Sequence, residues 1–172
     1  FQLSFCIGLM IAVAAVVAPA IGAGRHQEAQ RLGTVSLLLM AASRVLFPGL
    51  TIPFHAHRLL STLLVVAGLL LLFGAAWQFR REQTTLDPRA PGRATRFVAK
   101  GLYRFSRNPM YLGMALLLFG AAAWSSSLLA YLLAACFCVY IHALQIKPEE
   151  RALRAAFGDD YAAYMASVRR WI

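Results

Sequence analysis

The chain is poor in charged residues and in cysteine, and both shortages limit the classes of protein to which it can belong. Only 14% of its 172 residues are charged, against about 25% in a typical soluble domain. Hydrophobic residues make up 60%, so we expect a membrane protein rather than a soluble domain with a large core. The three cysteines all lie within apolar runs. This position argues against a disulfide framework or a metal site and favours buried, inert thiols.

Acidic residues are scarcer than basic ones. The chain has seven Asp and Glu residues and 17 Lys and Arg residues, which gives a net charge of +10. In a soluble protein this excess would suggest a nucleic-acid partner. Here the basic residues cluster between apolar runs, as expected from the positive-inside rule and from attraction to anionic lipid headgroups. We therefore expect membrane lipids as partners, and no nucleic acid.

Several apolar runs are long enough to cross a bilayer, which takes about 20 residues. The predicted spans are residues 3–23, 33–53, 58–79, 109–125 and 127–146. The first lacks the basic segment that precedes a secretory signal, so we expect it to be retained. The second is the weakest, because Arg44, Pro48 and Gly49 interrupt it. The short turn at residues 124–127 predicts a tight helical hairpin. The expected fold class is an all-α integral membrane bundle of about five transmembrane helices.

The distribution of Lys and Arg predicts the orientation of the chain. The connection at residues 80–107 and the tail after Ile146 hold most of the basic residues, so both should be cytoplasmic. The tail reads as two amphipathic helices broken at Gly158, with Arg169 and Arg170 suited to the last helix end. The polar connection and the cytoplasmic tail are therefore expected on one side of the membrane, where they can meet.

The sequence GLYRFSRNPMYLGM, residues 101–114, places unusual polar chemistry at the start of an apolar run. Pro109 fits the first turn of a helix, and Asn108 can cap that helix. The free N–H groups of this helix start form an anion-binding end, which Arg104 and Arg107 reinforce.

The same segment carries features suited to a flat ligand. Tyr103 and Tyr111 offer aromatic faces with polar tips, and Gly101 and Gly113 allow a ligand or a helix to approach closely. An anion and a flat ring are therefore the expected ligand features.

A pair of acidic residues ends the last apolar run. Glu149 and Glu150 suit a cation, an amine or ribose hydroxyls. Facing an anion-binding end, the pair would fit a zwitterionic cofactor. Plainer interpretations remain open: the arginines as topology signals, the tyrosines as interfacial aromatics, and Glu150 paired with Arg154 one helical turn on.

The two segments together resemble the isoprenylcysteine carboxyl methyltransferase family, which is grouped with the phospholipid methyltransferases. These are integral-membrane enzymes that use S-adenosylmethionine. The positions that match the family pattern are Gly101, Tyr103, Arg104, Arg107, Pro109, Tyr111, Gly113, Glu149, Glu150, Leu153, Phe157, Gly158, Tyr161 and Tyr164. TTLDP at residues 84–88 also resembles bacterial members. The resemblance covers residues 58–172, the expected methyltransferase-like core, whereas residues 1–57 form N-terminal spans of uncertain role.

The resemblance implies methyl transfer from S-adenosylmethionine to a carboxylate of a lipid-borne or apolar acceptor. Such a carboxylate is already ionised at neutral pH and needs no general base. The resemblance also implies a bacterial inner membrane protein whose cofactor site opens to the cytoplasm.

The same resemblance implies roles for individual residues. The segment from Tyr103 to Gly113 and the glutamate pair would line the cofactor pocket. Arg107, Asn108 and the helix start at Pro109 would hold the methionine carboxylate, and Glu149 or Glu150 would hold the amine or ribose. An arginine after the pair, Arg151 or Arg154, would act as the catalytic group that orients the acceptor.

One position departs from the family pattern. Asn108 stands where eukaryotic-type members have His. Asparagine can donate and accept hydrogen bonds but cannot act as a titrating base. We expect cofactor binding to survive this change, while the acceptor stays open.

Other interpretations are kept beside this one. Phospholipid amine N-methylation would need a base, a membrane reductase would need a nicotinamide cofactor and a larger bundle, and a non-enzymatic basic scaffold would bind only lipid. No metal site is expected, because His55 and His57 lack an evident third ligand. Arg44 within a span and His142 near the pocket remain weaker candidates.

Overall fold

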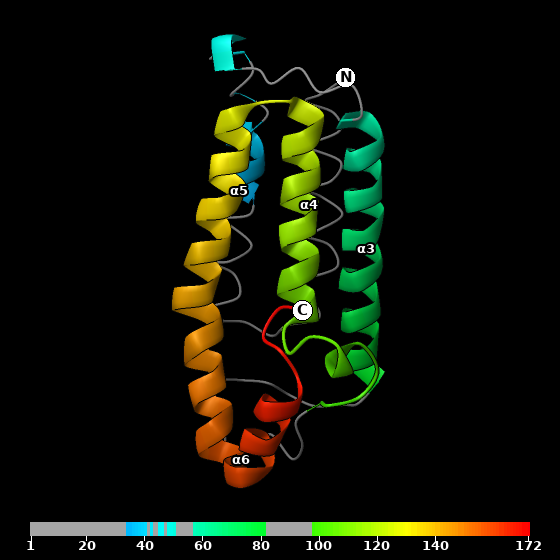
Figure 1. The fold of residues 1–172 in the computed structure, drawn as a ribbon, viewed down its shortest axis with the longest axis vertical. Helices are drawn as coiled ribbons and strands as arrows, with labels where there is room; N and C mark the ends of the chain where they lie inside the picture. The colour runs from blue at the N-terminus through cyan, green and yellow to red at the C-terminus, as the bar shows by residue number, and fades with distance from the viewer. Residues whose placement is uncertain (1–33, 41, 43–44, 47, 51–56, 82–97) are drawn as a thin grey trace.

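The computed structural model describes residues 34–40, 42, 45–46, 48–50, 57–81 and 98–172 (Figure 1). The predicted span at residues 3–23 lies outside these residues, as do Arg44 and His55. Within the weak second span, residues 34–40 are helical. Leu37 and Met40 of this piece are buried in the hydrophobic core. All regular elements in the described ranges are helical, which agrees with the expected all-α class.

The upper part of the bundle in Figure 1 is formed by helices that lie side by side. They are α3 (His57–Arg81), α4 (Pro109–Ser125) and α5 (Leu128–Ile141). A π-helical turn, η4 (His142–Ile146), joins α5 to α6 (Lys147–Ser167). Short 3-10 turns are η1 (Pro48–Leu50) and η3 (Gly101–Arg104).

Small residues bring α3 and α4 close together. A Cβ atom added to Gly113 would lie 2.9 Å from the carbonyl oxygen of Gly68. Further along, the buried Ser61 hydroxyl donates a 2.8 Å hydrogen bond to the carbonyl of Gly120. Close backbone approach and a hydroxyl bonded across helices are typical of helix packing in membranes.

Two helical segments, Arg58–Gln78 and Leu128–Ser167, are long and apolar enough to cross a membrane. They overlap almost all of the predicted spans 58–79 and 127–146. The predicted span 109–125 is the shorter apolar helix α4. Leu63, Leu70 and Trp77 are exposed on α3, as expected for side chains that face lipid. These apolar helices point to membrane association, while the count of five spans stays a prediction.

The predicted hairpin is present between α4 and α5. Ser126 adopts the left-handed conformation, with φ of 51°, after α4 ends at Ser125, and α5 begins two residues later. The prediction of buried thiols is wrong for Cys136. This residue lies exposed on α5, and Cys138 is partly exposed, because that side of the helix turns away from the core.

The C-terminal region bends as the sequence predicts. Gly158 has φ of 53°, which breaks α6 into two helical pieces. After Ser167 the chain becomes extended, with Val168 at φ −123° and ψ 131°. Its last residues return to the foot of α4 (Figure 1). Arg169 and Arg170 therefore lie beyond the helix, and the prediction that they complete its C-terminus is wrong.

Candidate active site

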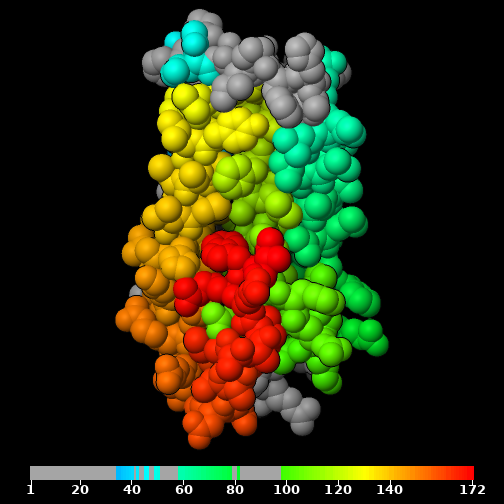
Figure 2. All heavy atoms as spheres, viewed as in Figure 1, coloured from blue at the N-terminus to red at the C-terminus, as the bar shows by residue number. Residues whose placement is uncertain are grey.

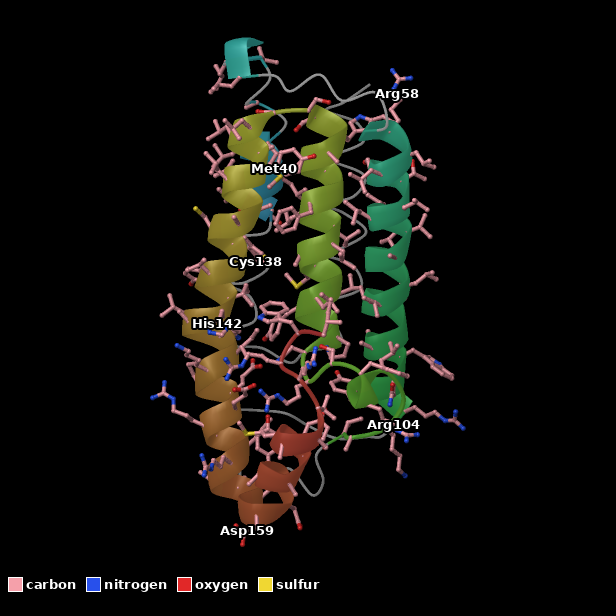
Figure 3. All side chains as sticks on the ribbon, in the orientation of Figure 1. Met40, Arg58, Arg104, Cys138, His142 and Asp159 are labelled. Atoms are coloured by element: carbon pink, nitrogen blue, oxygen red, sulfur yellow. The ribbon has the colours of Figure 1, made fainter. Side chains whose placement is uncertain are left out.

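The first motif is attached to the end of α3. Gly101 opens η3 with φ of 57°, a conformation that favours glycine. The side chain of Gln78 donates to the carbonyl of Lys100 and accepts a 3.1 Å hydrogen bond from the backbone N–H of Leu102. These bonds fix the segment from Gly101 onward beneath the bundle. Figure 3 shows Arg104 and Asp159 at this end of the molecule and Arg58 at the other.

The second motif follows the π-helical turn. Such turns are rare in proteins, and those that occur are often found at functional sites. Gln145 of this turn is buried, and its amide donates a 3.2 Å hydrogen bond to Oε1 of Glu149. The hydroxyl of Tyr111 in α4 donates to the same oxygen at 2.8 Å. The two motifs therefore meet, as their expected placement on one side of the membrane predicts.

Glu150 lies at the centre of a buried charged cluster. Nη2 of Arg107 lies 3.1 Å from Oε1 of Glu150, and Nη2 of Arg170 lies 2.6 Å from Oε2. Nε of Arg170 adds bonds of 3.0 and 3.1 Å to the two oxygens. The side chain of Glu150 is 8% exposed and that of Arg107 is 9% exposed. Glu150 thus pairs with these two arginines instead of Arg154, which is exposed on α6.

Arg107 is held on several sides yet keeps one buried donor. Its Nη1 donates to the carbonyl of Met165 at 3.2 Å, and its backbone N–H donates to the carbonyl of Arg169 at 3.0 Å. Its buried Nε has no hydrogen-bond partner among the described residues. A buried donor without an acceptor is costly. An acceptor oxygen on a ligand would satisfy it, so the residue fits the expected carboxylate of a zwitterionic cofactor.

Asn108 does not cap α4 with its side chain, contrary to prediction. Its Nδ2 donates a 3.1 Å hydrogen bond to the carbonyl of Arg170, and its backbone N–H donates to the hydroxyl of Ser106. The returning tail provides this acceptor and draws the amide away from the helix start. Pro109 does occupy the first turn of α4, as predicted, and it is buried.

Three tyrosines lie where η3 meets the second half of α6. Tyr164 donates a 2.6 Å hydrogen bond to the carbonyl of Tyr103, and the rings of Tyr161 and Tyr164 lie 5.8 Å apart. Burial raises the pKa of Tyr164 to about 12, partly opposed by the positive charge of Arg107. Burial also raises the pKa of Tyr103 and of Tyr161 above the usual range. All three phenols are therefore neutral near pH 7 and act through hydrogen bonds and ring faces.

The remaining candidates lie at the margins of this cluster. Gly113 was predicted to allow a ligand or a helix to approach closely, and in the structure α3 packs against it. Arg151 and Arg154 are exposed on α6, and their role toward an acceptor stays a prediction. His142 lies in the π-helical turn (Figure 3). Within the described ranges no three His, Cys, Asp or Glu residues are grouped as metal ligands.

Sequence reasoning missed three residues of this arrangement: Ser106, Gln145 and Arg170. Arg170 was assigned only to a helix end, because contacts 20 and 62 residues apart along the chain leave no local pattern. Gln145 carried a usable signal. A polar amide four residues before a glutamate, inside an apolar run, is placed to hydrogen-bond that glutamate on a helix.

Comparisons with known proteins identify a family for most of this region. The sequence model of the phospholipid methyltransferase family matches residues 56–160. That range includes the first motif and the second from Glu149 to Gly158, and it ends before Tyr161, Tyr164 and the tail that carries Arg170. A protein of Haemophilus influenzae, described as uncharacterized, is 40% identical over 63 residues, which are 37% of this chain and all of that protein.

Proposed function

The chain belongs to the phospholipid methyltransferase family, and from this membership we propose a membrane methyltransferase that uses S-adenosylmethionine and methylates a carboxylate of a lipid-borne or apolar acceptor. One observation carries the proposal. Two polar segments from different helices converge through Tyr111 with Glu149 and through Arg107 with Glu150. A scaffold that binds only headgroups has no need to bury such a cluster.

The donor set suits the cofactor. Bound S-adenosylmethionine supplies an electrophilic methyl group on a sulfonium. The unpaired Nε of Arg107 is suited to its carboxylate, and the Glu149 carboxylate is suited to its amine or ribose. The neutral Tyr103 and Tyr161 offer aromatic faces close to these groups. Because these residues come from both motifs, they would bind and orient the cofactor only when α4 and α6 are correctly packed.

The acceptor chemistry favours a carboxylate. An amine must lose a proton before it attacks, whereas a carboxylate is already ionised. Both glutamates of the site are held by hydrogen-bond donors, and the three tyrosines stay protonated. The protonated phenols therefore cannot accept the proton of an amine near pH 7. Desolvation and alignment would then be the main contributions of the protein.

We place the site on the cytoplasmic side of a bacterial inner membrane, since the basic residues of the two motifs lie together at one end of the bundle. The acceptor would enter sideways from the bilayer between the helices, and Arg151 or Arg154 would orient it. Phospholipid amine N-methylation is the second candidate, favoured because the family is named for phospholipid methyltransferases.

The first experiment measures S-adenosylmethionine binding by calorimetry on detergent-purified protein. We expect micromolar binding by the wild type and strong weakening in Arg107→Ala and Glu150→Ala. Lys100→Ala is the matched control, since Lys100 directly precedes the same segment and its side chain is exposed. Thermal unfolding of each variant separates lost binding from lost folding. A folded wild type that binds no cofactor would refute the proposal.

The second experiment identifies the atom that is methylated. Protein is incubated with methyl-labelled cofactor and either an N-acetylated farnesylcysteine or phosphatidylethanolamine in vesicles. Label transferred to a carboxylate is released as methanol by alkali, because esters hydrolyse, whereas label on an amine is retained. Alkali-stable label on the phospholipid would replace the carboxylate proposal with amine methylation.

A further inference from the structure

The last residues of the chain form a strap across the two motifs. We use this name for residues 169–172, which follow α6 in an extended course. Figure 2 shows this C-terminal end lying between the segment after α5 and the segment before α4. Trp171 packs against the hydrophobic core, which anchors the strap. The family match ends at residue 160, so no role is assigned to the strap by that comparison.

We propose that Arg170 is a positioning residue of the cofactor site, which fixes the Glu150 carboxylate in place through a two-pronged contact. This inference rests on the proposed function. Nε and Nη2 of Arg170 reach both oxygens of Glu150, at 3.0, 3.1 and 2.6 Å. A planar guanidinium that contacts both oxygens restricts rotation of the carboxylate, which a single donor does not do.

The backbone of the same residue is tied to the other motif. The carbonyl of Arg170 accepts hydrogen bonds from Nδ2 of Asn108 at 3.1 Å and from the hydroxyl of Ser106 at 3.4 Å. The side chain and the carbonyl of one residue therefore join the start of α4 to the start of α6. Any shift of the strap would move Glu150 relative to Arg107, whose Nη2 holds the other side of that carboxylate.

The contact differs from an ordinary surface ion pair, which contributes little to stability. The Glu150 side chain is 8% exposed, and that of Arg170 is 30% exposed. The hydrogen bonds to Glu150 raise the pKa of Arg170, so the strap carries its positive charge throughout the physiological range. Neighbouring Arg169 is exposed and contributes only its backbone carbonyl, which accepts from Arg107.

This difference between neighbours supplies the matched control. Arg170→Ala, Arg170→Lys and Arg169→Ala are purified as full chains in detergent. S-adenosylmethionine affinity and the thermal midpoint are measured for each. We expect roughly a tenfold to hundredfold weaker affinity for Arg170→Ala, the loss of a charge-assisted contact. Arg170→Lys should recover part of this loss, and Arg169→Ala should stay within about twofold of the wild type.

The outcomes separate this inference from the proposed function. A wild type that binds no cofactor refutes the proposed function, and the positioning role with it. If the wild type binds the cofactor and Arg170→Ala binds it equally well, the positioning role alone is refuted. It is also refuted if Arg169→Ala loses as much affinity as Arg170→Ala. A fall in thermal midpoint without a change in affinity also refutes it, since the arginine would then be merely structural. If Arg170→Ala does not fold, the cofactor affinity of Arg170→Lys is compared with that of Arg169→Lys. Equal affinities of these two variants overturn the proposal.

Discussion

Replacing Glu150 with glutamine removes one buried negative charge while keeping the volume of the side chain. In the native protein this carboxylate lies between Arg107 and Arg170, with contacts of 2.6 to 3.1 Å. A glutamine amide has one acceptor oxygen, and its NH₂ group faces guanidinium N–H groups. Both arginines therefore lose their charged partner inside the protein, and at least one of them also loses its hydrogen-bond acceptor.

The structure sets the size of this loss. Removing one partner of a buried ion pair costs about 3–5 kcal/mol. Arg107 is 9% exposed and takes the full cost, whereas Arg170 is 30% exposed and keeps some hydration. We therefore expect the free energy of unfolding to fall by about 3 kcal/mol, near the lower limit. Glu149→Gln should cost about 1 kcal/mol, because Glu149 accepts bonds from neutral Tyr111 and Gln145.

The assay follows helical circular dichroism while the proportion of sodium dodecyl sulfate in mixed micelles is raised. Wild type, Glu150→Gln and Glu149→Gln are compared under identical conditions. The two glutamates are adjacent and chemically identical, so detergent effects cancel between them. Equal destabilisation of the two variants, or a larger loss for Glu149→Gln, would refute the reasoning from the buried cluster.

Three further predictions concern other contacts. Asn108→Asp should weaken cofactor affinity about tenfold in calorimetry, because a carboxylate would face the carbonyl of Arg170; Asn108→His, which keeps an N–H donor, should weaken it less. Gly113→Ala should lower the free energy of unfolding in mixed micelles by about 1–3 kcal/mol, because its Cβ would lie 2.9 Å from the carbonyl oxygen of Gly68. Stability should fall between about pH 10 and 12, because native Tyr164, with a pKa of about 12, keeps a proton that the unfolded phenol releases near 10. Thermal midpoints across this range should decline less steeply in Tyr164→Phe.

Much of the fold and part of the site could be predicted from local sequence. Apolar runs predicted α3, α4 and α5, and Gly158 and the serine turn predicted where helices break or reverse. Tyr111 and Glu149 were expected on one side of the membrane, and they are in contact. Their exact roles toward a cofactor remain predictions.

The partners of individual charges could not be predicted in this way. Local spacing offered Arg154 as one partner for Glu150, but Arg107 and Arg170 contact that carboxylate instead. Asn108 appeared suited to cap α4, yet it holds the tail instead. In each case a residue brought near by folding provided the partner in place of the adjacent helical turn, and burial strengthens such a hydrogen bond.

The sequence by itself indicated membrane association, the helices α3, α4 and α5 and the family, because hydrophobic length, helix breakers and clustered motifs all act over a few residues. Only the tertiary structure decided that the chain end crosses the two motifs and that Glu150, rather than Glu149, lies at their charged centre. The physical reason is that a charged side chain pairs with the groups that folding places beside it, whatever their separation along the chain. Helix packing and the kink at Gly158 bring that partner into place from distant parts of the chain.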